Sequence, residues 1–253
     1  MAKKEDTRPR HQQIAASLRA SIMSGDLEPG ERLPTTQQLM ERYGVTGQTV
    51  QRTLQVLKEE GFVFGRPGVG VFIRAETPLA VQVAAFLSPP PGHGPHPWMS
   101  RARERGQRGS AKLLEVTRTK PPRQVTQALD IDPDEDVVLR YQALSLDDEP
   151  VELAWNYYPL AIADGTPLER RTRIRGGSAA LLTDLGYSPL EHVDRVSVRL
   201  ATPEEFTALE LPDDVPVLRT LRTVYSHDAR PVEVSVLVKG GHRHELVYQG
   251  AIG

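Results

Sequence analysis

Residues 11–73 contain the pattern that most restricts how this 253-residue chain can fold. Ile14, Leu18 and Ile22 recur at every fourth position, which is the spacing of one buried face of an α-helix. Gly25 and the turn at Leu27-Glu28-Pro29-Gly30 end that helix, because proline and glycine favour turns over helix continuation. The segment therefore begins with one amphipathic helix of limited length.

Two further helices and a hairpin follow in the same segment. Thr35 and Gln38 form a capping box, which predicts the start of a second helix. Thr46 is a candidate cap for a third helix, whose buried stripe is Val50, Leu54 and Leu57. After Gly61, two apolar runs flank a glycine-rich tip, as in a β-hairpin. The hairpin comprises Phe62-Val63-Phe64, the tip Arg66-Pro67-Gly68-Val69-Gly70, and Val71-Phe72-Ile73.

The third helix carries polar side chains off its buried stripe. Amides, a hydroxyl and a guanidinium near a helix N-terminus can bond base edges and phosphates. A solvated face is the ordinary explanation of such residues, but three helices followed by a hairpin favour a winged helix-turn-helix, a DNA-binding module. The polar residues are Gln48, Thr49, Gln51, Arg52 and Gln55.

Charge and composition agree with this prediction without establishing it. Residues 1–75 contain 11 Lys/Arg and 8 Asp/Glu, whereas the remainder contains 20 and 25. A mildly basic front and an acidic back fit a DNA-binding head on a different kind of body. The absence of cysteine excludes disulfides, thiolate metal sites and a cysteine nucleophile. No run approaches the ~18 apolar residues of a membrane span, and the first residues lack the apolar core of a signal peptide, so we expect a cytoplasmic protein.

The rest of the chain is expected to form a linker and an α+β domain. Five prolines in residues 88–97 predict a semi-rigid linker, which gives domains at 1–75 and 98–253 with a linker at 76–97. Thr202-Pro203-Glu204-Glu205 predicts a helix start. Just before it, Val196, Val198 and Leu200 alternate with polar residues, as in a half-buried strand.

The back domain also contains an internal echo. An Ala-Leu step, an acidic turn and a Val-Leu-Arg run near 128–140 recur near 208–219, and Pro150-Val151-Glu152 matches Pro231-Val232-Glu233. Two copies of a helix–turn–hairpin unit would form a pseudo-symmetric domain. Clefts between such halves commonly bind small molecules.

Residues 11–73 resemble the GntR family of bacterial transcription regulators. The resemblance implies a homodimer that reads a near-palindromic double-stranded DNA operator, with the third helix in the major groove and the wing in the minor groove. It rests on Gln13-Ile14-Ala15, Ile22, Gly25, Leu27, Pro29-Gly30-Glu31-Arg32-Leu33-Pro34, Leu39, Tyr43-Gly44-Val45, Thr49-Val50, Leu54, Gly61 and Gly68-x-Gly70.

The chain departs from the family pattern where DNA contacts are expected. Thr46-Gly47 and Gln51 stand where the family usually has Ser-Arg and Arg, Gln37 occupies a commonly basic position, and Val69 replaces the wing arginine. We therefore expect a different operator from the family's common one. The predicted DNA-binding residues are Arg8, Arg10, Thr35, Gln37, Thr46, Gln48, Thr49, Gln51, Arg52, Arg66, Gly68 and Gly70.

The body resembles the effector-binding UTRA domain of the HutC-type branch of this family. The resemblance implies a chorismate-lyase-like α+β fold that binds a small molecule, is not an enzyme and needs no metal or cofactor. The matching pieces are Arg101–Gly106, Leu139-Arg140, Glu149-Pro150-Val151, Tyr157-Tyr158-Pro159, Thr202–Glu205, Arg219 and Arg230–Glu233.

The predicted effector site also departs from the family. Ala143 and Ser145 align with an Arg-x-Arg that sugar-phosphate-sensing members carry, and only Glu233 keeps the family's residue. A phosphate held without bidentate guanidinium loses its best partners, so we expect the effector to be neutral or apolar and not a sugar phosphate. Trp155 and Tyr157 could equally be core aromatics. The candidates are Arg101, Tyr141, Ala143, Ser145, Trp155, Asn156, Tyr157, Glu233 and Lys239.

Three alternatives compete with a ligand-released repressor. His242 and His244 would share a face of a strand and suggest a metal site, but no third ligand is evident, so exposed polar residues are the preferred interpretation. A constitutive DNA-binding protein whose body only dimerises is a second alternative. An enzyme of chorismate-lyase-like fold is more remote, because no Walker loop, nucleophile elbow or paired-carboxylate motif is present.

Overall fold

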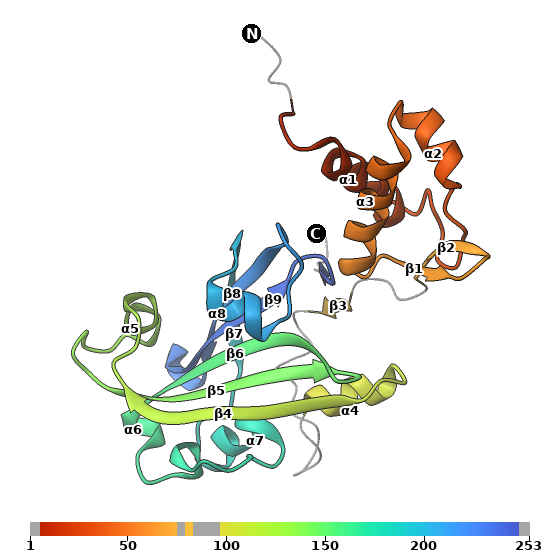
Figure 1. Cartoon of the computed structure of the whole chain (residues 1–253). Helices are drawn as coiled ribbons and strands as arrows, with labels where there is room; N and C mark the ends of the chain where they lie inside the picture. The colour runs from red at the N-terminus through yellow and green to blue at the C-terminus, as the bar shows by residue number, and fades with distance from the viewer. Residues whose placement is uncertain (1–5, 75–78, 83–96, 248–253) are drawn as a thin grey trace, which may run out of the picture. The chain divides into compact units, whose positions relative to one another are not determined.

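The computed structural model describes residues 6–74, 79–82 and 97–247 and divides into two compact units (Figure 1). Met1–Leu79 is called the head, and Ala80–Gly253 the body. The linker expected over 76–97 contains a strand, β3 (Leu79–Gln82), and its last residue begins helix α4 (Pro97–Glu104). The rest of that predicted linker, including its proline-rich part before residue 97, lies outside the described residues.

The head is a three-helix unit with a two-stranded wing. Its elements are α1 (Arg10–Met23), α2 (Thr36–Tyr43), α3 (Gly47–Glu59), β1 (Val63–Arg66) and β2 (Gly70–Ile73), with β1 and β2 antiparallel. Both predicted caps are confirmed, because Thr35 accepts from the Gln38 amide in a capping box and Thr46 accepts from the Thr49 amide. The predicted apolar stripes meet in one core that includes Ile14, Leu18, Leu39, Val50, Leu54 and Leu57.

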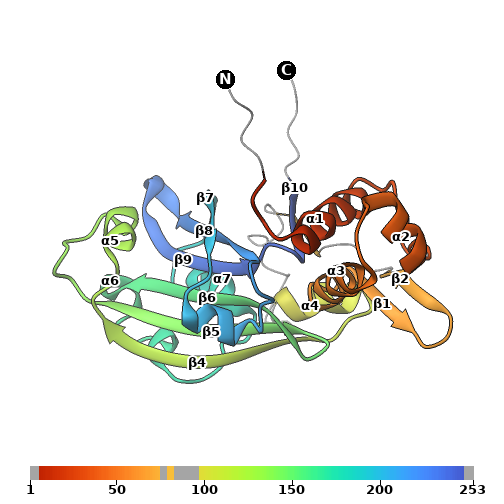
Figure 2. The same ribbon diagram turned by 45° about the horizontal axis from the view of Figure 1, so that its top comes forward.

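The body is built on a six-stranded antiparallel sheet (Figure 2). Its spatial order is β4-β5-β6-β9-β8-β7, so β4 and β7 form the two edges among the described strands. A separate pair joins β3 to β10 (His244–Val247). The six strands are β4 (Gly109–Thr119), β5 (Val137–Leu146), β6 (Glu149–Pro159), β7 (Glu191–Leu200), β8 (Pro216–Tyr225) and β9 (Pro231–Gly240).

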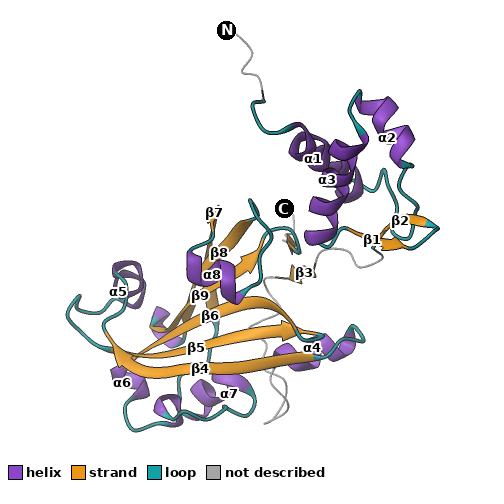
Figure 3. Ribbon diagram, in the orientation of Figure 1, coloured by secondary structure: helices purple, strands orange, loops and turns teal. Residues whose placement is uncertain are grey.

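Helices cover both faces of this sheet, as Figure 3 shows. Helix α5 (Arg123–Leu129) and the segment that follows α8 (Pro203–Ala208) pack on the face formed by Val137, Leu153, Tyr157 and their neighbours. The opposite face packs against α6 (Leu160–Ala163), the 3-10 helix η2 (Pro167–Glu169) and α7 (Gly177–Asp184). A short 3-10 helix, η3 (His227–Ala229), joins β8 to β9.

The internal echo corresponds to a real repeat in the sheet. Strand β4, helix α5 and hairpin β5–β6 form one unit, and β7, α8 and hairpin β8–β9 form a second in the same order. The two units meet at the β6–β9 pair in the middle of the sheet. In a unit on its own, β6 or β9 would have one edge of unpaired backbone N–H and C=O groups. Pairing β6 with β9 satisfies both edges and joins the two hairpins into one sheet.

The interpretation of Val196, Val198 and Leu200 as a half-buried face is wrong. The strand exists as predicted, and the Thr202–Glu205 capping box that follows it is confirmed. However, Val198 is 64% exposed and Leu200 72% exposed. The physical reason is that β7 is an edge strand, and no described helix covers this end of it. An alternating sequence shows which residues share a face, but not whether that face is covered.

Candidate DNA-binding surface and effector pocket

The exposed side of α3 is the main candidate DNA-binding surface of the head. Val50, Leu54 and Leu57 turn into the core, which leaves Gln48, Gln51, Arg52 and Gln55 exposed. Gln55 donates to Glu59 within the helix. The predicted contact residues Gln48, Gln51 and Arg52 are therefore exposed on one side of α3. Thr49, next to the cap, is half-buried.

Several other predicted DNA-binding residues are engaged within the head itself. The Thr46 and Thr49 hydroxyls lie 3.1 Å apart at the start of α3. Thr35 caps α2 with its hydroxyl oxygen, and the Gln37 amide donates to Glu41 at 3.2 Å. These side chains form hydrogen bonds at helix ends or along a helix surface. To contact DNA, each of them would either bond DNA in addition to its present partner or give up that partner.

The N-terminal arginines are exposed but paired. Arg8 donates to both carboxylate oxygens of Asp6, which lowers the pKa of that carboxyl to about 2. Arg10 donates to the Gln13 side chain at 2.8 Å and to the Tyr43 carbonyl. The contacts of Arg10 place its guanidinium beside the end of α2.

The wing combines a glycine-rich tip with a stacked arginine. Gly68 has a φ of 72°, and Gly70 has a φ of 147°, a backbone conformation that favours glycine. The Arg66 guanidinium lies over the rings of Phe64 and Phe72, at 5.4 and 4.8 Å from their centroids. These cation–π contacts hold the guanidinium on the wing surface.

Arg32 is a head residue that the site prediction missed. A Cβ built on Gly70 would lie 2.6 Å from the Arg32 Nε atom, so a larger residue at this position would displace the Arg32 side chain. Arg32 also forms an isolated bridge with Phe72. An exposed guanidinium therefore lies against the wing. It comes from the loop before α2, and only its place in the matched Pro-Gly-Glu-Arg-Leu-Pro run could have indicated it.

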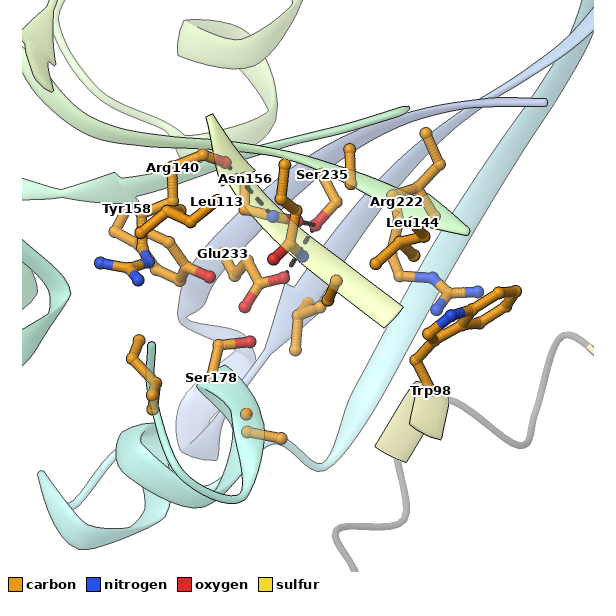
Figure 4. A pocket seen from close by; sticks show the side chains of 18 of the residues that line it. Trp98, Leu113, Arg140, Leu144, Asn156, Tyr158, Ser178, Arg222, Glu233 and Ser235 are labelled. Atoms are coloured by element: carbon orange, nitrogen blue, oxygen red, sulfur yellow. Dashed lines mark hydrogen bonds between the residues drawn. The ribbon is translucent and has the colours of Figure 1, made fainter. Parts of the chain in front are cut away.

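The body contains a pocket of about 220 Å³ between the sheet and α7 (Figure 4). Strands β5, β6, β8 and β9 supply alternate residues to it, and α4 supplies Trp98. Both repeat units therefore contribute to its wall. Lining residues used below are Trp98, Arg140, Gln142, Glu152, Asn156, Tyr158, Arg173, Ser178, Arg222, Glu233 and Ser235.

Two of the pocket's arginines are bound within the protein. Arg140 donates to the Leu168, Arg170 and Thr172 carbonyls at 2.7, 2.8 and 2.7 Å, and burial lowers its pKa. Arg222 forms two 2.7 Å bonds to the Asp194 carboxylate, with both side chains more than nine-tenths buried. A third arginine lies at the pocket on the segment before α7.

A hydrogen-bonded polar chain crosses the middle of the pocket wall, as the dashed lines of Figure 4 show. Asn156 donates to the Arg140 carbonyl, and the Ser235 hydroxyl lies 2.8 Å from Asn156 Oδ1 and 2.7 Å from Glu233 Oε1. Tyr158 and Ser178 line the same pocket as Glu233. Burial raises the pKa of the Tyr158 phenol well above its ordinary value, and Glu233 adds to that shift.

Of the predicted effector-binding residues, Asn156 and Glu233 line the pocket. Lys239 is buried and pairs with the lining residue Glu152 at 2.8 Å. Arg101, on α4, does not line the pocket, and burial lowers its pKa.

The other five predicted effector residues do not line the pocket and lie on the opposite sheet face. Tyr141 stacks on Trp155 with ring centroids 4.6 Å apart, and Tyr157 packs with Val125 and Leu129 of α5. Trp155 and Tyr157 are therefore core aromatics, the alternative weighed from the sequence. Ala143 and Ser145 alternate with lining residues along β5 and so point away.

The sequence contained a signal that would have located the missed lining residues. Asn156 and Glu233 were identified, and side chains two positions apart share a strand face. From Glu233 that rule gives Ser235, and from Asn156 it gives Tyr158. Through the Arg140–Asn156 pairing it also gives Gln142 on β5.

His242 and His244 are the pair that the sequence offers as a possible metal site. Among the residues described, no cluster of three or more His, Asp or Glu side chains could hold a metal ion, and no helix there is long and apolar enough to cross a membrane. The interpretation of both histidines as exposed is wrong for His244, which is 7% exposed and lies 2.9 Å from the Gly240 carbonyl. Its partner is a backbone carbonyl, which a neutral imidazole N–H can bond.

Burial makes His244 a source of pH-dependent stability. Desolvation lowers its pKa to about 3, so below pH ~6.5 the unfolded chain takes up a proton that the folded chain does not. The free energy of unfolding should therefore fall with decreasing pH between ~6.5 and ~3. Urea unfolding at pH 7 and pH 5 should show a loss about 2 kcal/mol larger for the unmodified protein than for His244→Asn. Equal losses would show that His244 has an ordinary pKa in the folded protein.

A head of three helices and a wing, in one chain with a body that contains a pocket, is the organisation of a transcription regulator with an effector domain. The profile of the bacterial regulatory proteins of the gntR family matches residues 10–73, and the UTRA domain profile matches residues 104–245. The chain belongs to the GntR family and carries a UTRA domain, and this family consists of transcription regulators rather than enzymes.

Individual relatives span nearly the whole chain. It is 31% identical to the transcriptional regulator PhnF of Escherichia coli, over 90% of this chain and 89% of that protein. It is 26% identical to an HTH-type transcriptional regulator of Streptomyces coelicolor, over 95% and 92%. The crystal structure of PhnF from Mycobacterium smegmatis has the same fold, with a TM-score of 0.56, 19% identity, and coverage of 94% of this chain and 100% of that one.

Proposed function

We propose that this regulator is a cytoplasmic repressor that binds a near-palindromic operator as a homodimer and is released by a small molecule other than a sugar phosphate. The observation that carries the proposal is the combination, in one chain, of a recognition helix with exposed amides and a guanidinium and a pocket of about 220 Å³. A body that only dimerised would not need a pocket with a buried polar wall.

The electrostatics of the pocket argue against a phosphate. A phosphate dianion favours paired, bidentate guanidinium donors. The Arg140 guanidinium already donates to three backbone carbonyls, and the Arg222 guanidinium is bound to the Asp194 carboxylate. Of the lining arginines in the described chain, this leaves Arg173, which contacts the Met99 sulfur, as the guanidinium that bonds neither a carbonyl nor a carboxylate. Glu233 would meanwhile repel an anion.

The polar chain indicates what the effector carries instead. A serine hydroxyl has one proton, so Ser235 donates to either Asn156 or Glu233 at a given moment. A hydroxyl or amine donor on a bound molecule would satisfy the acceptor that Ser235 leaves. We therefore infer a neutral or zwitterionic effector with a hydrogen-bond donor directed at Glu233.

Titration calorimetry tests this inference directly. Glucosamine 6-phosphate should give no measurable heat at micromolar protein, because the pocket offers it too few free cationic donors. A thermal-shift screen of uncharged and zwitterionic metabolites should find a stabilising ligand, since a ligand at 100 times its Kd adds ~2.7 kcal/mol. Glu233→Gln should weaken that ligand, whereas Gln124→Ala, on the α5 side of the sheet, should not. Micromolar binding of the amino-sugar phosphate would exclude the inference, and no ligand at all would favour a constitutive repressor.

Edge strand β7 is the surface that we propose for dimerisation. Val196, Val198 and Leu200 share one face of it, and its outer edge has no partner strand in the described sheet. A second copy aligned antiparallel would pair both edges and bring the two apolar rows into contact side by side, with one two-fold axis. A palindromic operator requires this symmetry.

Coupling between effector and operator would pass through the segment that joins the two units. We propose domains at 1–75 and 98–253 with a connecting segment at 76–97. Effector binding in the body would change the orientation of the two linked heads, so that they no longer match successive major-groove faces.

The proposal as a whole is tested by selecting DNA bound by the full-length protein from a random library. We expect enrichment of an inverted repeat, and loss of binding to it when a ligand from the thermal-shift screen is added. Enrichment of a single unrepeated half-site would exclude a dimeric reader. Binding without sequence preference would exclude a specific regulator.

A further inference from the structure

Three exposed side chains of α3 form no hydrogen bond or ion pair within the described part of the chain. Gln48, Gln51 and Arg52 make no side-chain hydrogen bond or ion pair to another residue of the described chain. The neighbouring polar groups differ, because Gln55 bonds Glu59 and the Thr46 and Thr49 hydroxyls contact each other. Two amides and one guanidinium are thus free to bond an outside partner.

Helix geometry places the three groups on one narrow surface. Positions 48, 51 and 52 differ by three and four residues, so they fall within about 100° of the helix circumference. They also span about 6 Å along the axis, which is roughly two base-pair steps at ~3.4 Å each. One α3 in a major groove would therefore present them to about three neighbouring base pairs.

Their chemistry indicates which bases they read. A glutamine amide has a donor and an acceptor that match adenine N7 and N6, whereas an arginine fork matches guanine O6 and N7. We propose that Gln48 and Gln51 each read an adenine and that Arg52 reads a guanine in every operator half-site. This inference rests on the proposed DNA-binding function and adds the identity of the bases.

Selection from a random library with the full-length protein provides the first test. We expect two A·T columns and one G·C column within about four base pairs of each half-site. Gln51→Arg should convert one A·T column to G·C and leave the other columns unchanged. The matched control is Met23→Arg, which adds the same guanidinium to an exposed position of α1 instead of α3, and it should leave the selected pattern unchanged.

A single-atom change in the DNA provides the second test. Replacing the adenine read by Gln51 with 7-deazaadenine removes N7 and keeps Watson–Crick pairing, and should weaken binding of the unmodified protein about tenfold. Gln51→Ala should bind both duplexes equally. Equal binding by the unmodified protein, or a G·C pair selected at that column, would overturn the base assignment while leaving a specific DNA-binding protein. Failure to enrich any sequence would instead contradict the proposed function itself.

Discussion

Replacing Val198 and Leu200 together by glutamate is expected to leave the protein monomeric and to weaken operator binding by about 100-fold or more. Both side chains are largely exposed on β7, at the edge that we propose to pair with a second copy. Four glutamates brought together on the two paired strands would repel one another and oppose that contact. A monomer would bind each half-site independently and lose the effective concentration that two linked heads provide.

Sedimentation and fluorescence anisotropy measure the two parts of this prediction. Met23→Glu is the matched control, because Met23 is 62% exposed but belongs to the head, and it should remain dimeric. A double variant that sediments as a dimer would assign dimerisation to another surface. A monomeric variant with unchanged operator affinity would show instead that one head is sufficient for binding.

Replacing Asp194 by alanine is expected to lower the free energy of unfolding by about 3–5 kcal/mol. Asp194 and Arg222 are 6% and 8% exposed, and the carboxylate accepts two 2.7 Å bonds. Removing it leaves a guanidinium in a buried place without those acceptors, which is costlier than losing an exposed pair. Because Arg222 lines the pocket, ligand binding should also change.

Urea unfolding of the whole chain tests the loss. The control is Lys120→Met, which removes an ion pair whose partners are 61% and 94% exposed, and it should cost less than about 1 kcal/mol. Asp194→Asn, which keeps the shape and one acceptor, should lie between the two. A loss below 1 kcal/mol for Asp194→Ala would show that water or another group replaces the carboxylate.

Local signals predicted the elements better than their surroundings. Thr35, Thr46 and Thr202 cap helices as expected, because a cap depends on residues within one turn. The exposed face of β7 was not foreseeable, because the position of a strand in a sheet depends on pairing between distant segments. The repeat could be found from the sequence because both copies kept the same helix-to-strand spacing.

An error of one residue along a strand is enough to misplace the predicted pocket residues. Ala143 and Ser145 were chosen on β5, whereas Gln142 and Leu144 line the pocket, one position away. Since side chains alternate, a shift of one residue moves a whole prediction to the opposite face. Arg140 and Arg222 could not be assigned from sequence at all, because their partners, three carbonyls and Asp194, lie 28 or more residues away.

The partners of Arg140 also affect how the two activities respond to ionic strength. The Arg140 guanidinium bonds the neutral backbone carbonyls of Leu168 and Thr172. The Arg222–Asp194 ion pair is buried and therefore shielded from counterions. Contacts to DNA phosphates, by contrast, weaken steeply as salt displaces them. The affinity for the effector should therefore still be measurable at salt concentrations at which the head no longer binds DNA. Effector binding and DNA binding can then be measured separately in the same intact protein.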